Sequence, residues 1–578
     1  MGEELAIRAK LRIGLALSGG GFRASLFHLG VIRRLEELGI MEQVTLVSAV
    51  SGGSIIAAFY LCEMEKHLRT FRIASHGGPI APDRVALFED IAERFLKGVD
   101  HNLRTRALIF TVCFHPWLFL KTLVMKTFRA GARADLIQAE YDRWFFNKDT
   151  LDQLPVERPD SADGRTPPEC LAGRDEPFYG PKLLLNTTSL LTGERTVFSR
   201  DTSSGIDDLK TPDKNVLLLS RVVGASSGVP VLFPPTPICG DLLVDGGVSD
   251  NQGIEGLFGE CDVILVSDAS GQLELKHTLS TSSYSVYQRV NEIFQFQIRN
   301  KLLELLMKWR EARPERSFAF IHLLVNLKSR RGSPPRVSTE ILPALGRIRT
   351  DLDQFSPVER EALMYHGYTL IDAQLREYCC DFLKTCSPDF HRRKLKTPPL
   401  FQDPVQESER CRTKIRRDLE AGCEGFYLLR CLKKYQWQTV LVFLCGLVAL
   451  SGLVWYVFGP LRFLVDFTKN ALKGFLYGIV PEALVVQIDR LLYFFGFEEL
   501  TPTIDGVAHL LALLILFGIS AYVASFPVYL VVRRAAMWQD LRLYKKMTKG
   551  KGPTLHWVEA NEGTGRVADR ESQDSPEK

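Results

Sequence analysis

The sequence predicts a three-layer α/β domain with a mainly parallel central sheet, followed by a C-terminal two-helix transmembrane hairpin. Three observations support this prediction. The first two-thirds of the chain alternates strand-like and helix-like segments, a pattern typical of a parallel sheet covered by helices. A glycine-rich turn follows each of the first two expected strands. In the last third, residues 438–458 and 510–532 carry no charge, and each run is long enough to cross a bilayer core.

The composition excludes several classes of protein. A chain of 578 residues with 46% hydrophobic and 24% charged residues is globular and large enough for more than one domain. Its net charge of +4 is too close to neutral to indicate a nucleic-acid partner. The twelve cysteines form no CxxC pair, so we expect free thiols in a reducing compartment, with no metal site and no disulfide framework.

The expected elements follow from hydrophobic periodicity. Residues 13–17 are predicted to form the first strand, and residues 25–38 carry the apolar stripe of a helix that stops at Gly39. Residues 44–47 and 55–62 are predicted to form the second strand and the second helix. A later long amphipathic helix is expected at residues 286–310. Four more buried strands are expected at residues 182–185, 216–219, 263–266 and 318–325.

The turn after the first strand reads Ser18-Gly19-Gly20-Gly21-Phe22-Arg23-Ala24. Glycines let the backbone turn sharply and aim several N–H groups at one point, and the following helix N-terminus adds positive potential. The loop is therefore predicted to hold an anion. Taken alone, it also fits a dinucleotide-binding loop, which has the same strand–glycine–helix layout.

The turn after the second strand, from Ala49 to Ser54, has the strand–turn–helix context of a nucleophile elbow. Small residues on both sides of Ser51 permit the strained turn that lifts its hydroxyl out of the sheet. Further along, a hydrophobic strand delivers Asp245 into the flexible turn Gly246-Gly247. Three other aspartates remain rivals for the role of partner to Ser51: Asp241, Asp250 and Asp268.

Together these three turns resemble, in order and spacing, those of the patatin-like phospholipases. The resemblance extends from about residue 13 to about residue 378, with further matching stretches at residues 222–235, 246–253 and 348–368. The first glycine-rich loop also resembles that of cytosolic phospholipases that share the fold.

The resemblance implies a serine lipid acyl hydrolase with a Ser–Asp dyad and no catalytic histidine, metal or organic cofactor. Ser51 is the implied nucleophile and Asp245 the implied base. Phospholipids, lysophospholipids or acylglycerols are the implied substrates. The implied oxyanion donors are backbone amides of the two glycine-rich turns, namely Gly19, Gly20, Gly21, Phe22 and Gly52.

Several nearby residues have open roles at this stage. Arg23 could bind a lipid phosphate, since a guanidinium can hold phosphate oxygens bidentately, or it could pair with a core carboxylate. His28 is expected to be structural. Ala24 and Ala49 stand where the family often has glycine, and we expect the added methyl groups to tighten packing.

Basic residues flank both uncharged runs, with Lys433 and Lys434 before the first and Arg533 and Arg534 after the second. By the positive-inside rule both flanks are cytosolic, so the two spans form a hairpin. Met1 to Lys10 is charged and does not resemble a signal peptide, so the hydrolase domain is expected on the cytosolic face of a membrane. The chain is therefore predicted to consist of a hydrolase domain at residues 1–386 and a linker at 387–434. The hairpin region follows at 435–535, and a basic, then disordered, tail at 536–578.

Two further interpretations stay open. Residues 108–128 are strongly apolar and aromatic, and they fit a lid or interfacial helix near the site or a helix of the core. The chain could also be a nucleotide-binding regulator or an inactive membrane scaffold on a lipase fold. The expected partners are a lipid substrate and the bilayer, with no nucleic acid and an undetermined oligomeric state.

Overall fold

The computed structural model describes residues 11–74, 83–106, 131–157, 179–203, 217–230, 233–271, 273, 280–325, 337, 340–402, 408–424 and 533–559. The chain divides into two compact units. The first consists of residues 1–111, 116–430 and 541–578, and the second of residues 112–115 and 431–540. Only residues 533–540 of the second unit are described, and they are helical.

A mixed, mainly parallel sheet forms the centre of the first unit, with the strand order β10-β9-β1-β2-β5-β8-β7. Its first five strands run parallel to one another, whereas β7, β8 and β6 are added antiparallel beyond or beside β5. The strands span Ser317–His322, Val263–Asp268, Ile13–Leu17, Leu46–Val50, Lys182–Ser189, Asp241–Asp245 and Thr236–Ile238, with β6 at Arg195–Phe198. The two predicted turns therefore leave neighbouring parallel strands at the same edge of the sheet.

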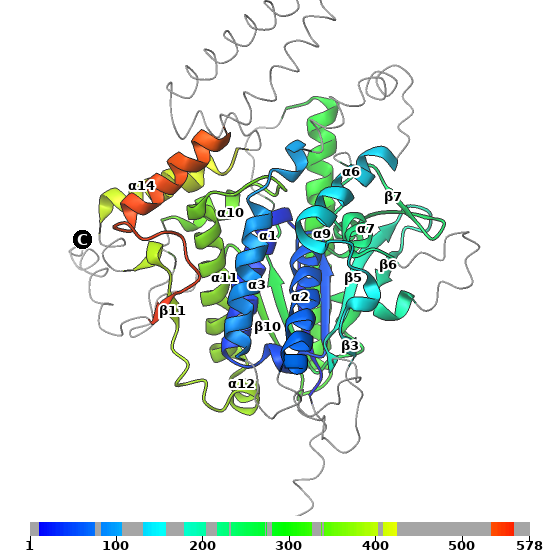
Figure 1. Ribbon diagram of the computed structural model, residues 1–578. Helices are drawn as coiled ribbons and strands as arrows, with labels where there is room; N and C mark the ends of the chain where they lie inside the picture. The colour runs from blue at the N-terminus through cyan, green and yellow to red at the C-terminus, as the bar shows by residue number, and fades with distance from the viewer. Residues whose placement is uncertain are drawn as a thin grey trace, which may run out of the picture. The chain divides into compact units, whose positions relative to one another are not determined.

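Helices cover both faces of this sheet, which confirms the three-layer prediction. Alternate residues of each strand enter opposite cores, as the two-residue period of a strand requires. Leu15 and Leu265 pack on one face, under α1 (Gly21–Glu37), α2 (Gly52–Ala74), α3 (Arg84–Val99) and α11 (Pro357–Tyr378), which lie side by side in Figure 1. Ala16 and Ile264 pack on the other face, against α9 (Ser283–Glu311).

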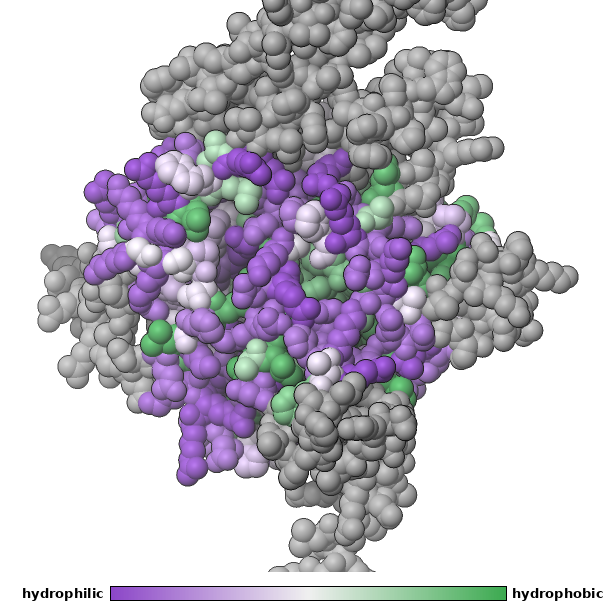
Figure 2. Space-filling model, in the orientation of Figure 1, coloured by the Kyte–Doolittle hydropathy of each residue, from purple (hydrophilic) through white to green (hydrophobic). Residues whose placement is uncertain are grey.

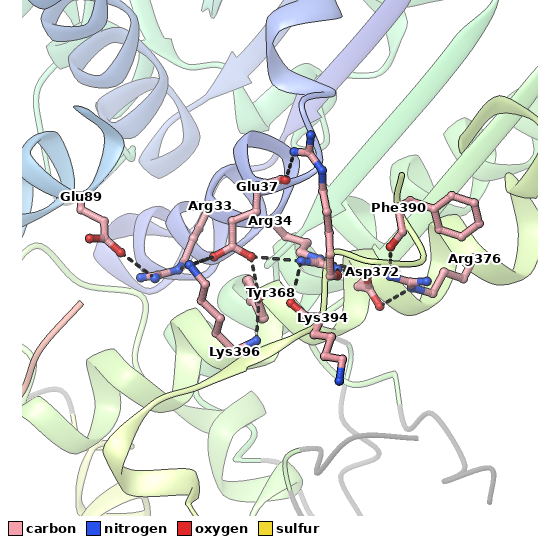
Figure 3. Close-up of polar contacts among 11 residues, drawn as sticks. Arg33, Arg34, Glu37, Glu89, Tyr368, Asp372, Arg376, Phe390, Lys394 and Lys396 are labelled. Carbon is pink, nitrogen blue, oxygen red and sulfur yellow. Dashed lines mark hydrogen bonds and ion pairs between the residues drawn. The ribbon is translucent and has the colours of Figure 1, made fainter. Parts of the chain in front are cut away.

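A buried ionic network joins the C-terminal end of α1 to α11 (Figure 3). Arg34 lies 2.7 Å from Asp372, and both Arg33 and Arg34 contact Glu37. The hydroxyl of Tyr368 donates to the same Glu37 carboxylate at 2.6 Å. Buried charges are tolerated when they are paired and hydrogen-bonded in this way, so the network fixes how the two helices pack.

Most predicted elements are confirmed, with shifted ends. The first helix begins at Gly21, and α9 matches the predicted long helix within three residues at its N-terminus. The prediction of a strand at 216–219 is wrong for the residues described there, because α7 (Leu219–Ser226) begins at Leu219. A short apolar run fits a buried helix start as well as a strand, so periodicity could not separate them.

The sequence prediction of a linker and a disordered tail requires correction. Within residues 387–434, α14 (Glu409–Ala421) buries Ile415 and Leu419 in the main core. After the second predicted span, a helix at 533–547 is followed by an ordered segment up to residue 559. Here β12 (Val558–Glu559) pairs with β11 (Lys396–Thr397), and Tyr544, Met547 and Trp557 belong to the main core. Few apolar side chains were enough to hold this segment because these three are buried.

Residues 541–559, which we call the C-terminal clasp, pack on both long helices of the ionic network. The Trp557 ring lies 4.1 Å from the Arg33 guanidinium and 5.1 Å, edge to face, from the Tyr368 ring. The Tyr544 hydroxyl donates to Glu361 of α11. Burial raises the pKa of Glu361 to about 7, and the bond from Tyr544 opposes that shift. The clasp is thus part of the folded first unit.

No helix among the described residues has the length and apolar character needed to cross a membrane. The predicted spans at 438–458 and 510–532 lie outside the described residues, as does the 108–128 segment.

Candidate active site

Ser51 lies in a strained turn between β2 and α2. Its φ of 51° falls in the left-handed region, which costs a serine about 1–3 kcal/mol and persists only where the surroundings enforce it. The backbone N–H of Ser51 donates to Ser226 Oγ at 3.1 Å, and Ile55 N–H donates to the Ser51 carbonyl at 3.2 Å. This geometry is that of a nucleophile elbow, as the sequence predicted.

Glycine is required where the two glycine-rich turns meet. A Cβ on Gly52 would lie 2.1 Å from the Gly21 carbonyl oxygen, and one on Gly19 would lie 3.1 Å from Ser51 Cβ. No side chain fits at either position. In contrast, Ala24 and Ala49 are fully buried in the main core, so their methyl groups add packing there. The glycines of both turns thus let the Gly19–Ala24 loop lie directly against the Ser51 turn.

Asp245 ends β8, and the Ser51 side chain is near enough to its carboxyl group to lower the pKa of that group. The carboxylate accepts the Gly247 N–H at 2.7 Å. Burial raises the pKa of Asp245 to about 6, against the opposing effects of the Gly247 N–H and the Ser51 side chain. A carboxylate with that pKa is ionised at neutral pH and has gained proton affinity, as a general base needs.

The segment Ser226-Ser227-Gly228, which we call the bridge, lies between the Ser51 turn and the Asp245 turn. Ser226 Oγ accepts the Ser51 N–H and donates to the Asn186 carbonyl of β5 at 2.6 Å. The Ser226 and Gly228 carbonyls accept the N–H groups of Gly246 and Asp245 at 3.3 and 3.1 Å. Ser226 and Gly228 therefore hold the elbow and the aspartate turn in register.

The predicted oxyanion donors differ in their availability. The Gly19 N–H donates to the Asn251 carbonyl at 2.9 Å, and the Phe22 N–H donates to the Asp351 carbonyl at 2.8 Å. Both amides are occupied in this structure, which corrects their inclusion in the set. The amides of Gly20, Gly21 and Gly52 donate to no residue in the part of the chain that the structure describes. These three remain candidates for stabilising an oxyanion.

Arg23 is not placed to bind a substrate phosphate. Its side chain points into the protein, is 3% exposed, and donates to the Ile348 and Ala269 carbonyls at 2.7 and 2.9 Å. Burial lowers its pKa to about 10. Neither sequence interpretation anticipated these partners, because the terminal nitrogens of the guanidinium donate to carbonyl oxygens rather than to a phosphate or a carboxylate. Arg23 ties the start of α1 to two loops at the same sheet edge.

His28 is structural, as expected, since it bridges Ser267 Oγ and the Ser18 carbonyl, and burial lowers its pKa to about 4. The rival aspartates have other partners. Asp241 accepts from Ser189, and Asp250 caps the turn that follows it. Asp268 pairs with Arg299 at 2.9 Å.

Sequence reasoning did not single out Ser226 or Asn251. A Cβ on Gly19 or on Gly247 would lie 2.3 or 2.6 Å from Asn251 Oδ1, so this amide stands between the two turns. Both residues lie in stretches that had marked the family resemblance, yet their roles depend on contacts across long sequence separations. Within the described ranges, no cluster of three or more histidine, cysteine or acidic side chains could hold a metal ion.

The fold and site define an α/β protein with a serine in a strained strand–turn–helix connection beside a buried aspartate. Residues 15–258 match the model of a family described as Patatin-like phospholipase, and this segment is similar to that family. A search of curated proteins found no match.

Two solved structures illustrate the similarity. VipD from Legionella pneumophila is 14% identical, with 87% of this chain and 88% of that chain covered and a TM-score of 0.26. Human GIVD cytosolic phospholipase A2, in complex with methyl gamma-linolenyl fluorophosphonate, is 13% identical, with 67% of this chain covered and a TM-score of 0.34. This chain spans 60% of the length of that human protein.

Proposed function

We propose that this protein is a lipid acyl hydrolase that cleaves carboxylic esters of phospholipids, lysophospholipids or acylglycerols with Ser51 and Asp245. The observation that carries the proposal is the proximity of Ser51, held at a positive φ, to Asp245, whose pKa burial raises to about 6 against the opposing effect of the Ser51 side chain. The match of residues 15–258 to a phospholipase family supports the lipid substrate.

In the proposed mechanism, Ser51 Oγ attacks the ester carbonyl while Asp245 takes the hydroxyl proton. The amides of Gly20, Gly21 and Gly52 stabilise the tetrahedral oxyanion, and one such donor is typically worth about 2.7–4 kcal/mol. Collapse expels the alcohol, which receives the proton from Asp245. Water then attacks the acyl-serine, with Asp245 again taking the proton, and the fatty acid leaves as Ser51 regains its hydrogen. Neither step requires a metal or cofactor.

Labelling with a fluorophosphonate probe tests this assignment. We expect a covalent adduct at Ser51 in the unaltered protein and no adduct and no esterase activity after Ser51→Ala. The hydroxyl is not needed for packing, so the variant should remain folded. Turnover above background in purified Ser51→Ala protein would sink the proposal. An inactive scaffold or a nucleotide-binding regulator would give no adduct even in the unaltered chain.

We further propose that residues 438–458 and 510–532 span a membrane as a hairpin, with the hydrolase domain on the cytosolic face. The uncharged runs and their basic flanks motivate this proposal. An independent observation supports it, because α14 before the runs and the C-terminal clasp after them belong to the same compact unit. Two ends held by one folded unit lie on one side of a bilayer, so the number of crossings between them is even.

Protease protection in sealed vesicles tests the topology. In cytoplasmic-side-out vesicles without detergent, we expect digestion of the first unit and protection of residues 459–509. The reverse pattern would refute both the orientation and the compartment.

A further inference from the structure

The N-terminal half of α9 extends past the edge of the sheet at which Ser51 and Asp245 lie. Arg299, in the middle of α9, pairs with Asp268 at the carboxyl end of β9. The strand that follows α9 is β10, and it starts opposite Val263, at the amino end of β9. The C-terminal half of α9 therefore runs back along the sheet. Residues 283–298 therefore project beyond the strand ends by about 24 Å, at a rise of about 1.5 Å per residue. Figure 1 shows this part of α9 rising beyond the strands.

This projecting half, which we call the α9 tip (residues 283–298), exposes large apolar side chains along its length. Tyr287 is 55% exposed and Phe294 is 61% exposed, and they repeat at helical spacing with three neighbours: Val286, Val290 and Ile293. Arg289 and Glu292 pair with each other at 2.8 Å. By contrast, the face in Figure 2, over the helices of the main core, is largely hydrophilic. A solvent-facing stripe of this kind indicates an interaction surface.

Other exposed apolar residues lie at the same edge. α8 (Gly247–Asp250) directly follows the Asp245 turn, contacts α9, and exposes Val248. At the carboxyl end of β5, the turn after Ser189 exposes Leu190 and Leu191, and the Leu190 N–H donates to the carbonyl of Leu242, which is also exposed. The apolar surface thus surrounds the edge that carries the site and is not confined to one helix.

We propose that the α9 tip inserts into the lipid interface of a membrane and brings the Ser51 edge against the bilayer. The inference rests on the proposed function, since a lipid ester must leave the bilayer to reach Ser51. Two features of this chain favour a bilayer over a protein partner. First, the chain leaves the unit that carries the tip, passes through the uncharged runs at 438–458 and 510–532, and returns to the same unit. Second, the only charged residues of the tip within the described stretch, Arg289 and Glu292, pair with each other, so the tip has no net charge.

A photocrosslinking experiment tests the insertion without relying on catalysis. The full chain carries benzoylphenylalanine in place of Phe294 or, as the matched control, in place of Met307, which is 54% exposed on the other half of α9. Each protein is irradiated with phosphatidylcholine–phosphatidylserine vesicles that contain an alkyne-tagged lipid. We expect a lipid adduct at 294 and little or none at 307. Adducts to protein at 294, equal lipid labelling at both positions, or no lipid adduct at 294 would each overturn the inference.

Hydrolysis measurements then connect the tip to the site. We expect the double variant Val290→Glu/Phe294→Glu to hydrolyse vesicle phospholipid about tenfold more slowly, because charges oppose interfacial insertion, and to cleave a soluble short-chain ester normally. Met307→Glu should leave both rates unchanged. Equal losses on both substrates would refute the tip's role. Absence of a fluorophosphonate adduct in the unaltered chain would instead refute the proposed function and leave the crosslinking result standing.

Discussion

The contacts of Ser226 in the bridge Ser226-Ser227-Gly228 predict a loss of catalytic rate for Ser226→Ala. The Ser226 hydroxyl accepts the Ser51 N–H, donates to the Asn186 carbonyl, and contacts Ser54 Oγ at 2.8 Å. Because its hydrogen is directed to Asn186, Ser54 is the donor in the third bond. Ser226 is fully buried, so alanine leaves these groups without a replacement from water.

The magnitude follows from those three bonds. A net value of about 1 kcal/mol for each hydrogen bond converts to about fivefold per bond in the population of the correctly formed elbow. The positive φ of Ser51 stores about 1–3 kcal/mol, so the elbow depends on such support. We expect kcat for a soluble ester to fall between about fivefold, for one bond, and about 150-fold, for all three.

The assay compares kcat, KM and the rate of fluorophosphonate labelling for Ser226→Ala and Ser227→Ala. The second variant is the matched control, because Ser227 Oγ contacts the Tyr141 hydroxyl and the Val223 carbonyl but not the elbow. We expect a kcat loss with little change in KM for Ser226→Ala only. If it keeps the unaltered kcat, or loses no more than Ser227→Ala, the bridge does not position Ser51.

Three further outcomes are expected. Asp245→Asn should be nearly as damaging as Ser51→Ala, with no single histidine variant matching it. Hydrolysis by the unaltered chain should rise as the pH increases through about 6, since burial raises the pKa of Asp245 and only its ionised form accepts a proton. A flat pH–rate profile between about 5 and 8 would contradict this. Arg23→Met should lower the thermal midpoint and leave KM for phospholipid unchanged, because its guanidinium bonds only to carbonyls; a raised KM in a stably folded variant would restore it as a substrate ligand. Trp557→Ala should release the C-terminal clasp to limited proteolysis, given a typical cost of about 3–5 kcal/mol for truncating a buried aromatic, whereas the exposed Val558→Ala should not; equal cleavage of both would show that the ring does not hold the clasp.

The features that the sequence predicted best are those encoded locally. Glycine-rich turns after two strands were enough to anticipate the elbow and the loop beside it, because only glycine tolerates the approach of Gly52 to Gly21. The choice of Asp245 depended on resemblance, since hydrophobic periodicity alone did not distinguish it from Asp241 or Asp268.

What could not be predicted depends on partners distant in the chain. The Phe22 N–H donates to the Asp351 carbonyl, and the Arg23 side chain donates to carbonyls more than two hundred residues away. Composition likewise misjudged residues 549–559. A polar segment with few apolar residues usually cannot offset its ordering entropy, but here Trp557 enters a site already formed by Arg33 and Tyr368.

The C-terminal clasp also sets an order of events during synthesis. A chain emerges from the ribosome N-terminus first, so α1 and α11 are made long before residues 541–559. Until then, the sites that Tyr544 and Trp557 fill on those helices remain open. The first unit therefore completes its core only after residues 422–540, which separate α14 from the clasp in the sequence, have been synthesised.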